Sequence, residues 1–233
     1  IITCMNGIPH WYFHKLDNKY ANYKIKCLDP NLLIDNILPP DNIVGSVVYP
    51  ACEIVQPGTI KHIAGNRFSL GEPEGSESDR LKFISDILKR AGFRAPIQKN
   101  IRDEIWLKLI GNLSFNPISA LTGATLEQIC NDQGTEAIVR AMMTEAKIIA
   151  EELGAKINMS IEKRIDGARK VGAHKTSMLQ DIEAGKPIEI DSIIIAVKEL
   201  GELTCSPTPY IDTILNLCLL YTSRAHETVV HLV

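Results

Sequence analysis

The sequence lacks the patterns that mark several large classes of protein. No apolar run reaches the roughly 18 residues that a membrane-spanning helix needs. The first residues do not have the pattern of a signal peptide. There is no block of basic residues, and the formal net charge is -3, so neither a nucleic acid nor an anionic membrane is favoured as a partner. Internal repeats and low-complexity linkers are also absent.

Cysteine, glycine and histidine occur without the spacings that build sites. Neither GxGxxG nor GxxxxGK is present, so no glycine-rich cradle for phosphate is indicated. His10 and His14 are four residues apart, as in a zinc-binding helix, but a third ligand is missing, and we expect a short aromatic helix opened by Pro9. The cysteines stand far apart and are typical of free thiols in the reducing cytoplasm: Cys4, Cys27, Cys52, Cys130, Cys205 and Cys218.

The remaining composition is that of a globular chain. It has 233 residues, of which 45% are hydrophobic and 23% are charged, enough for one large domain or two small ones. The chain opens on IITCMNG, which has the pattern of a buried strand that runs into a turn, and it has no initiator methionine. Because proteins seldom begin in the middle of a strand, we expect a further N-terminal segment to precede it.

The pattern changes character near residue 100. Residues 1–99 predict an α/β part: a first strand, short antiparallel strands over residues 42–73, a helix capped by Ser76 and ended by Gly92, and a last strand over residues 93–97. Residues 100–221 predict an all-α part, with helices from residues 101, 125, 160, 174, 189 and 208. Residues 222–233 form a tail without a helical pattern, to which we assign no role.

A polar stripe interrupts the first helix of the second part. Lys108, Asn112 and Asn116 are four residues apart and share one helix face, and Phe115 lies almost beneath Lys108. Pro117 should kink or end the helix near Asn116. One interpretation is a solvated lysine that pairs with Glu104 on the surface. We favour a stripe that faces a ligand, because such groups are costly to bury without partners.

Three separated stretches together resemble the 2-dehydropantoate 2-reductase (ketopantoate reductase) family. They are MNGIP at residues 5–9, EIW at residues 104–106 with the polar stripe, and SMLQD at residues 177–181 with IEID at residues 188–191. The resemblance covers about residues 1–218. It implies that residues 1–99 are the last part of an N-terminal NADP-binding Rossmann-type domain. Residues 100–221 would then be a helical C-terminal domain of the 6-phosphogluconate dehydrogenase type.

The resemblance also implies an activity and the residues that carry it. The activity is the NADPH-dependent reduction of 2-dehydropantoate to (R)-pantoate, in the biosynthesis of pantothenate and coenzyme A. Lys108 would donate a proton to the ketone oxygen, and Glu189 would pair with Lys108 or with a substrate hydroxyl. Substrate binding would fall to Asn112, Asn116 and Ser177, and cofactor binding to Asn6. No metal is implied.

Several of these residues have local alternatives. Asn6 could only form a turn before Gly7, Ser177 could be a surface helix serine, and Glu189 could be a first-turn glutamate favoured by the helix dipole. His174 stands where better-known members of the family carry asparagine, which leaves another 2-oxoacid open as the substrate.

The alternatives for the protein as a whole come from different classes. One is a cytoplasmic reductase of a small-molecule 2-oxoacid, with no nucleic acid or membrane partner. Helical domains of this type often pair, so the resemblance is compatible with a homodimer. The other is a truncated, catalytically silent chain that acts only as a helical association module, since the phosphate-binding turn is missing.

Overall fold

The computed structural model describes residues 1–230, with side chains described as far as Thr222. The chain divides into two compact units, Ile1–Ile105 and Trp106–Val233. The division falls inside helix α3 (Ile101–Thr122), a few residues after the border that the sequence predicts. Each unit is described by itself below.

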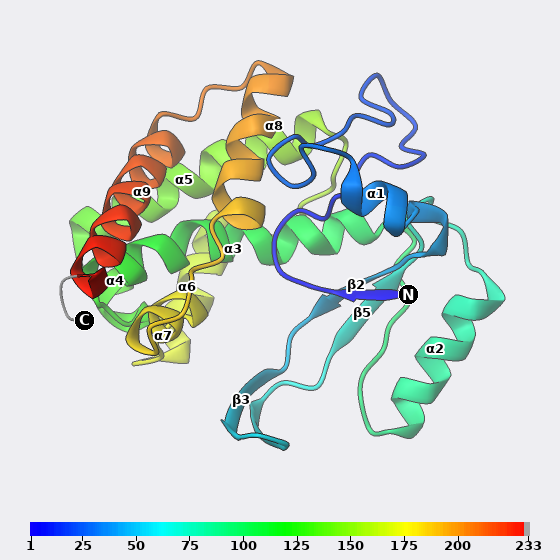
Figure 1. Cartoon of the computed structure of the whole chain (residues 1–233), viewed down its shortest axis with the longest axis horizontal. Coiled ribbons are helices and arrows are strands. Elements are labelled where there is room, and N and C mark those ends of the chain that lie inside the picture. Colours follow the sequence, from blue (N-terminus) through cyan, green and yellow to red (C-terminus); the bar gives the residue numbers. More distant parts are fainter. Residues whose placement is uncertain (231–233) are drawn as a thin grey trace. The chain divides into compact units, whose positions relative to one another are not determined.

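Unit 1 contains a three-stranded mixed sheet (Figure 1). The strands lie in the order β1 (Ile2–Cys4), β2 (Val44–Val48), β5 (Phe68–Gly71). β1 runs parallel to β2, and β5 runs antiparallel to it. The expectation of a buried first strand is wrong, because Ile2 is 40% exposed. In the described part of the sheet, β1 is an end strand with a neighbour on one side only.

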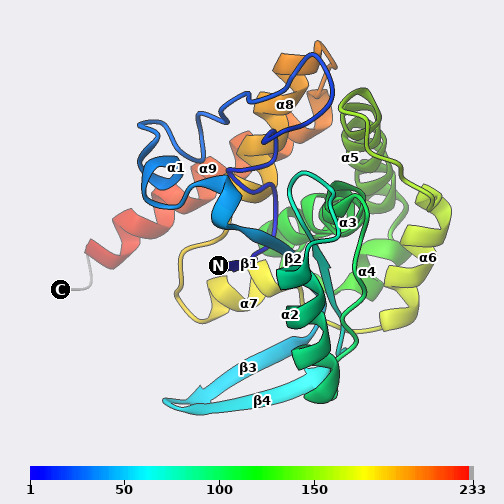
Figure 2. The ribbon, with the colours of Figure 1, turned by 90° about the vertical axis from the view of Figure 1, so that its right-hand side faces the viewer.

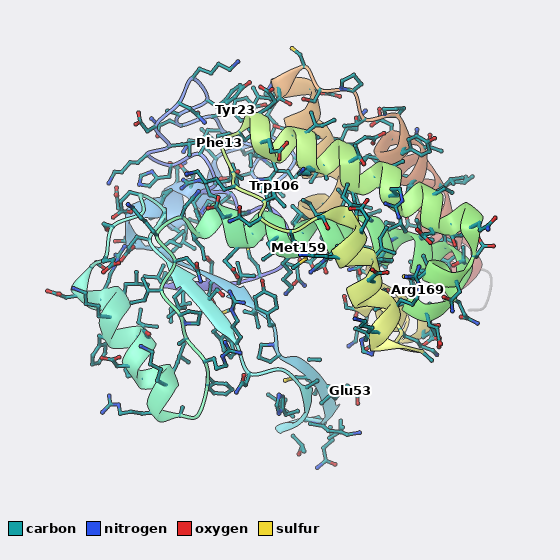
Figure 3. All side chains as sticks on the ribbon, turned by 180° about the vertical axis from the view of Figure 1, so that it is seen from behind. Phe13, Tyr23, Glu53, Trp106, Met159 and Arg169 are labelled. Atoms are coloured by element: carbon teal, nitrogen blue, oxygen red, sulfur yellow. The ribbon has the colours of Figure 1, made fainter. Side chains whose placement is uncertain are left out.

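A separate hairpin extends from this sheet (Figure 2). Its strands are β3 (Ala51–Gln56) and β4 (Thr59–Ala64), which pair antiparallel. Gly58 has a φ of +78°, which glycine adopts without strain in the tight turn between them. Most of the hairpin is exposed, including Glu53 at its edge (Figure 3). The predicted run of antiparallel strands is confirmed.

The aromatic stretch after β1 differs from the prediction. Trp11, Tyr12 and Phe13 lie in consecutive turns and form no helix, yet all three are buried. Phe13 packs edge-on against Tyr12 and Tyr23, with a centroid distance of 5.4 Å to Tyr23 (Figure 3). Burial of the rings holds this segment in place, since a stretch this short gains little from helical hydrogen bonds.

The remaining helices of unit 1 are short. They are α1 (Leu33–Ile37), a 3-10 turn (Pro40–Asn42) and α2 (Asp79–Arg90). The predicted cap of α2 is wrong: Ser78, and not Ser76, accepts a hydrogen bond from the backbone N–H of Leu81. α2 packs on the sheet through a small core of Val44, Leu70, Leu81 and Ala95. In place of the predicted last strand, residues 93–97 form two isolated parallel bridges, Arg67 to Arg94 and Leu70 to Ile97.

Unit 2 consists of helices, as predicted (Figure 1). After α3 come α4 (Leu126–Asn131), α5 (Gln133–Glu152), α6 (Ile161–Val171), α7 (Ser177–Glu183), a π-helical turn (Asp191–Ile195), α8 (Ala196–Thr204) and α9 (Pro209–Val230). The predicted caps are present: Thr125 and Gln128 form a capping box, and Ser160 caps α6. α7 begins later than expected, because Thr176 is its cap.

Two helix ends lie farther along the chain than the sequence predicts. α3 does not end at Asn116; it continues through Pro117 to Thr122. The side chains of Ile118 and Ala120 are buried, and this packing offsets the hydrogen bond that proline removes. α9 also continues through most of the predicted tail, as far as Val230, and residues 231–233 lie outside the described part. Among the described helices, none is both long and apolar enough to span a membrane.

Candidate functional site

The polar stripe of α3 lies in a largely apolar helix. Lys108 and Asn112 are half-buried, and Asn116 is only 5% exposed. Leu109, Leu113 and other apolar neighbours along the helix are buried. The three polar side chains are therefore partly withdrawn from water, which favours them as ligand-facing groups.

Burial changes the proton affinity of Lys108. Desolvation lowers the pKa of its ammonium group from 10.5 to about 8, the charge of Glu189 raises this pKa, and the charge of Arg164 lowers it. A lysine that gives up its proton close to neutral pH is suited to general acid–base chemistry.

Glu189 comes from a part of the chain that is distant in sequence. It precedes the π-helical turn (Asp191–Ile195), and its Oε1 accepts a hydrogen bond from the Ser192 hydroxyl at 3.2 Å. The fold thus brings an acid into electrostatic range of Lys108. This pair joins residues about eighty positions apart, and no local pattern could have located it.

Asn116 carries a buried donor without a partner. Its Nδ2 atom makes no hydrogen bond with any described group, and the same holds for the buried hydroxyl of Ser114. An unpaired buried amide costs free energy, so such a group in a native structure calls for an explanation. The Asn116 amide fits an oxygen acceptor on a bound molecule.

The two other predicted site residues, Ser177 and Asn6, lie outside α3. Ser177 is exposed at the first residue of α7, directly after Thr176. Asn6 is half-buried in unit 1, after β1 and before Gly7, whose φ is +75°. The positive φ of Gly7 fits the turn that the sequence indicates at Asn6. Of the six predicted site residues, Lys108, Asn112 and Asn116 lie on α3, and the structure brings Glu189 into electrostatic range of Lys108.

The interpretation of Lys108 as a solvated lysine paired with a surface glutamate is wrong. Glu104 is buried, and its carboxylate accepts hydrogen bonds from Tyr49 at 3.0 Å and from Ser69 at 2.9 Å. It also forms an ion pair with Arg67, with an N–O distance of 2.7 Å. Glu104 is a structural acid of unit 1.

No metal centre is evident in the described residues. They hold no group of three or more histidine, cysteine or acidic side chains placed to bind an ion. His14 instead contacts Asp41, with Nε2 3.1 Å from Oδ1. Each of the six cysteines is free.

Sequence reasoning missed Arg164 on α6. Its Nη2 atom donates a hydrogen bond to the carbonyl oxygen of Lys108 at 3.4 Å. The guanidinium lies where a side chain at Gly111 would otherwise be, 2.2 Å from an ideal Cβ position. The available signal was Gly111 itself, since a glycine inside a helix costs about 1 kcal/mol relative to alanine and often marks a close approach.

Comparison with known proteins identifies the family. Residues 100–221 match the family model described as ketopantoate reductase PanE/ApbA C terminal. A 2-dehydropantoate 2-reductase from Mesorhizobium japonicum is 50% identical over 217 residues, which cover 93% of this chain and 67% of that protein. The chain belongs to the ketopantoate reductase family.

Other members of the family agree with this assignment. A 2-dehydropantoate 2-reductase from Nostoc sp. is 28% identical over 167 residues, covering 69% of this chain and 52% of that protein. The crystal structure of a candidate ketopantoate reductase from Ralstonia solanacearum MolK2 has a TM-score of 0.91 and 40% identity, over 97% of this chain and 68% of that one. The chain thus spans between about half and two thirds of these relatives. It carries the later part of a Rossmann-type domain and the helical C-terminal domain that follows in this family.

Proposed function

We propose that this chain is part of an NADPH-dependent reductase that converts 2-dehydropantoate to (R)-pantoate, a step toward pantothenate and coenzyme A. Lys108 is the proton donor in this proposal. The observation that carries it is the lowered pKa of the half-buried Lys108, about 8, in the part of the chain that matches the ketopantoate reductase family model. The relatives at 50% and 28% identity bear the name of this reaction.

Reduction of a ketone adds a hydride to the carbonyl carbon and a proton to the carbonyl oxygen. A bound nicotinamide supplies the hydride. Lys108 delivers the proton to the oxygen from its ammonium group, and neutralises the alkoxide as the negative charge develops. Lys108 is then a neutral amine and regains a proton from solvent. Glu189 favours that step, because its negative charge raises the proton affinity of the amine.

The two asparagines of α3 hold the substrate. Their carboxamides can both donate to carboxylate oxygens and accept from hydroxyl groups. The unpaired Nδ2 of Asn116 supports this role, since a substrate oxygen would satisfy it. We assign a further substrate hydrogen bond to the exposed hydroxyl of Ser177 on α7.

Asn6 is the residue of this chain that we assign to the cofactor. It follows the carboxyl end of β1, which is parallel to β2, and dinucleotides bind outside the carboxyl ends of such strands. The half-buried amide fits a nicotinamide or ribose group there. The preference for NADPH over NADH rests on the family, because no glycine-rich phosphate motif occurs in this sequence.

The test follows NADPH oxidation by the protein expressed from its full reading frame, with 2-dehydropantoate as substrate. Turnover should be rapid, and Lys108→Ala should lower it by ~100-fold or more. Lys163→Ala, which removes an exposed lysine of α6, is the control and should leave turnover unchanged. An unchanged rate in Lys108→Ala would remove Lys108 from the mechanism.

A related reductase of another 2-oxoacid is the second candidate. It is favoured by His174, which is exposed three residues before Ser177 and differs from the asparagine that the family pattern leads us to expect. A panel of branched and hydroxylated 2-oxoacids separates the two. Loss of preference for 2-dehydropantoate would replace the first substrate assignment.

An association module without catalysis is the third candidate, and α9 supports association. Leu217, Leu220 and Tyr221 are exposed on α9, and apolar groups on one helix suit a second copy of the chain. Sedimentation of the catalytically tested protein gives its oligomeric state. A dimer that binds no NADPH would favour the module, whereas turnover would exclude a purely structural role. The free cysteines fit the cytoplasm that we propose as its location.

A further inference from the structure

An arginine side chain lies flat on the helix that carries Lys108. Arg164 is in the first turn of α6, which Ser160 caps and Met159 precedes (Figure 3). An ideal Cβ at Gly111 would lie 2.2 Å from Nη2, 2.7 Å from Nε and 2.8 Å from Cζ of Arg164. Three atoms of the guanidinium thus lie within 3 Å of the position that a Cβ at Gly111 would take. Only a residue without a side chain leaves this space open.

The same guanidinium is bound to the Lys108 turn. Nη2 of Arg164 donates to the Lys108 carbonyl oxygen at 3.4 Å, three residues before Gly111. Around it, Leu107, Ile110, Met143 and Ile161 line a mostly apolar hollow, to which Arg164 itself contributes. The arginine is half-buried, so water screens its charge less than that of a fully exposed side chain.

Two charges of opposite sign act on the Lys108 ammonium. Glu189 comes from the segment before the π-helical turn, and Arg164 comes from α6. The carboxylate holds the proton on Lys108, and the guanidinium favours its release. An acid that must both keep a proton before the reaction and release it during the reaction benefits from both neighbours.

We propose that Arg164 is a positioning residue for the proton transfer: its guanidinium occupies the space beside Gly111, holds the Lys108 turn of α3 through the Lys108 carbonyl oxygen, and places a positive charge near the Lys108 ammonium. This inference rests on the proposed function of Lys108. Arg164 itself needs no contact with substrate or cofactor for this role. Gly111 is part of the same arrangement. Alanine favours a helix more than glycine does, but its Cβ would displace the guanidinium of Arg164.

The first test titrates Lys108 directly in the folded chain. Lysines are dimethylated with ¹³C, and the Lys108 resonance is assigned by its loss in Lys108→Arg. In the unchanged protein this resonance should titrate with a pKa of about 8. Arg164→Gln and Gly111→Ala should each raise this pKa by roughly 0.5 or more, because the positive charge is removed or displaced. Arg164→Lys keeps the charge but not the flat contact, and should give a smaller rise.

Arg169→Gln is the matched control. Arg169 is on the same helix (Figure 3), but its guanidinium pairs with Glu136 and Asp166. This variant should leave the Lys108 titration unchanged. An unchanged Lys108 pKa in both Arg164→Gln and Gly111→Ala, with native circular dichroism, would overturn the proposal. If Arg164→Gln does not fold, Gly111→Ala and Arg164→Lys decide the question.

The second test uses the pH profile of turnover. The protonated lysine is the active form, so turnover falls as pH rises past its pKa. In Arg164→Gln this fall should move to higher pH, the plateau should drop about 3- to 10-fold, and KM for the oxoacid should hardly change. A merely structural role would not move the pH of the fall. The titration needs no turnover. Shifted titrations in a protein that reduces no oxoacid would therefore refute the proposed function and with it the role in proton transfer, whereas unshifted titrations in an active reductase would refute only the role of Arg164.

Discussion

The buried polar groups in the two halves of α3 differ in how completely they are hydrogen-bonded. In its first turn, Arg102 donates to three backbone carbonyls: that of Tyr12 at 2.7 Å, that of Pro73 at 2.6 Å and that of His14 at 2.9 Å. Glu104 is likewise bound by Arg67, Tyr49 and Ser69. These charged side chains link distant segments of unit 1 to the start of α3. Their hydrogen bonds and ion pairs offset the free-energy cost of burying the charges.

Farther along, in unit 2, the polar groups of α3 are matched less completely. Asn116 keeps an unpaired amide, and Lys108 holds its proton less tightly than a lysine in water. The comparison teaches that burial alone does not identify a site. Satisfied polar groups such as those of Arg102 stabilise the fold, whereas a buried amide without a hydrogen-bond partner indicates a group kept for another molecule.

The largest effect on stability should come from removing the hydrogen bonds of the first half of α3. Arg102→Met would leave three carbonyl oxygens, two of them in buried hydrogen bonds, without their donor, and should lower the free energy of unfolding by about 3–5 kcal/mol. Urea denaturation measures this loss. Arg90→Met, at the exposed end of α2, is the control and should change stability by less than about 0.5 kcal/mol. A loss below about 1 kcal/mol in Arg102→Met would show that the carbonyl contacts are not structural.

A smaller effect, on substrate binding, should come from replacing the unpaired amide in the second half of α3. Asn116→Leu removes the unpaired amide, so the free energy of unfolding should stay the same or rise. KM for the oxoacid should rise about 10-fold, because one substrate hydrogen bond is lost. Steady-state kinetics and urea denaturation of the same samples check both statements. Asn131→Leu, at the exposed end of α4, should change neither. A strong loss of stability in Asn116→Leu would make this residue structural, like Arg102.

The smallest effect concerns the pH dependence of stability. The pKa of Lys108 is about 8 in the fold and near 10.5 in the unfolded chain, so the unfolded chain binds more protons between these values. The cost of burying the charge is therefore fully present below pH 8 and disappears as pH rises toward 10.5. Lys108→Met should be more stable than the unchanged protein at pH 7, by about 1 kcal/mol or 2–4 °C in melting temperature.

Thermal melting at several pH values tests this prediction. The advantage of Lys108→Met should shrink steadily between pH 8 and pH 10.5 as the unchanged protein gains stability. Equal melting temperatures at every pH would mean that the buried ammonium is fully compensated in the fold. Lys108 would then resemble Arg102, and the contrast between the two halves of α3 would fail.

Much of the fold could be predicted from the sequence because it depends on residues that are close along the chain. The four-residue spacing of Lys108, Asn112 and Asn116 could place them on one face, because a helix repeats every 3.6 residues. Capping at Thr125 and Ser160 depends on atoms within three residues. The same reasoning failed where burial outweighed propensity: α3 passes Pro117, and the segment around Trp11 is held by packed rings without a helix.

By itself, the sequence determined the strand–hairpin–helix order, the polar face of α3 and the family to which the motifs belong. These depend on near neighbours and on the spacing of residues along the chain. The family resemblance also suggested that Glu189 pairs with Lys108. Only the tertiary structure decided that Arg164 lies near Lys108 and that three backbone carbonyls surround Arg102. The physical reason is that burial and electrostatics depend on distance in space. The proton affinity of Lys108 is therefore a property of the folded unit and not of its local sequence.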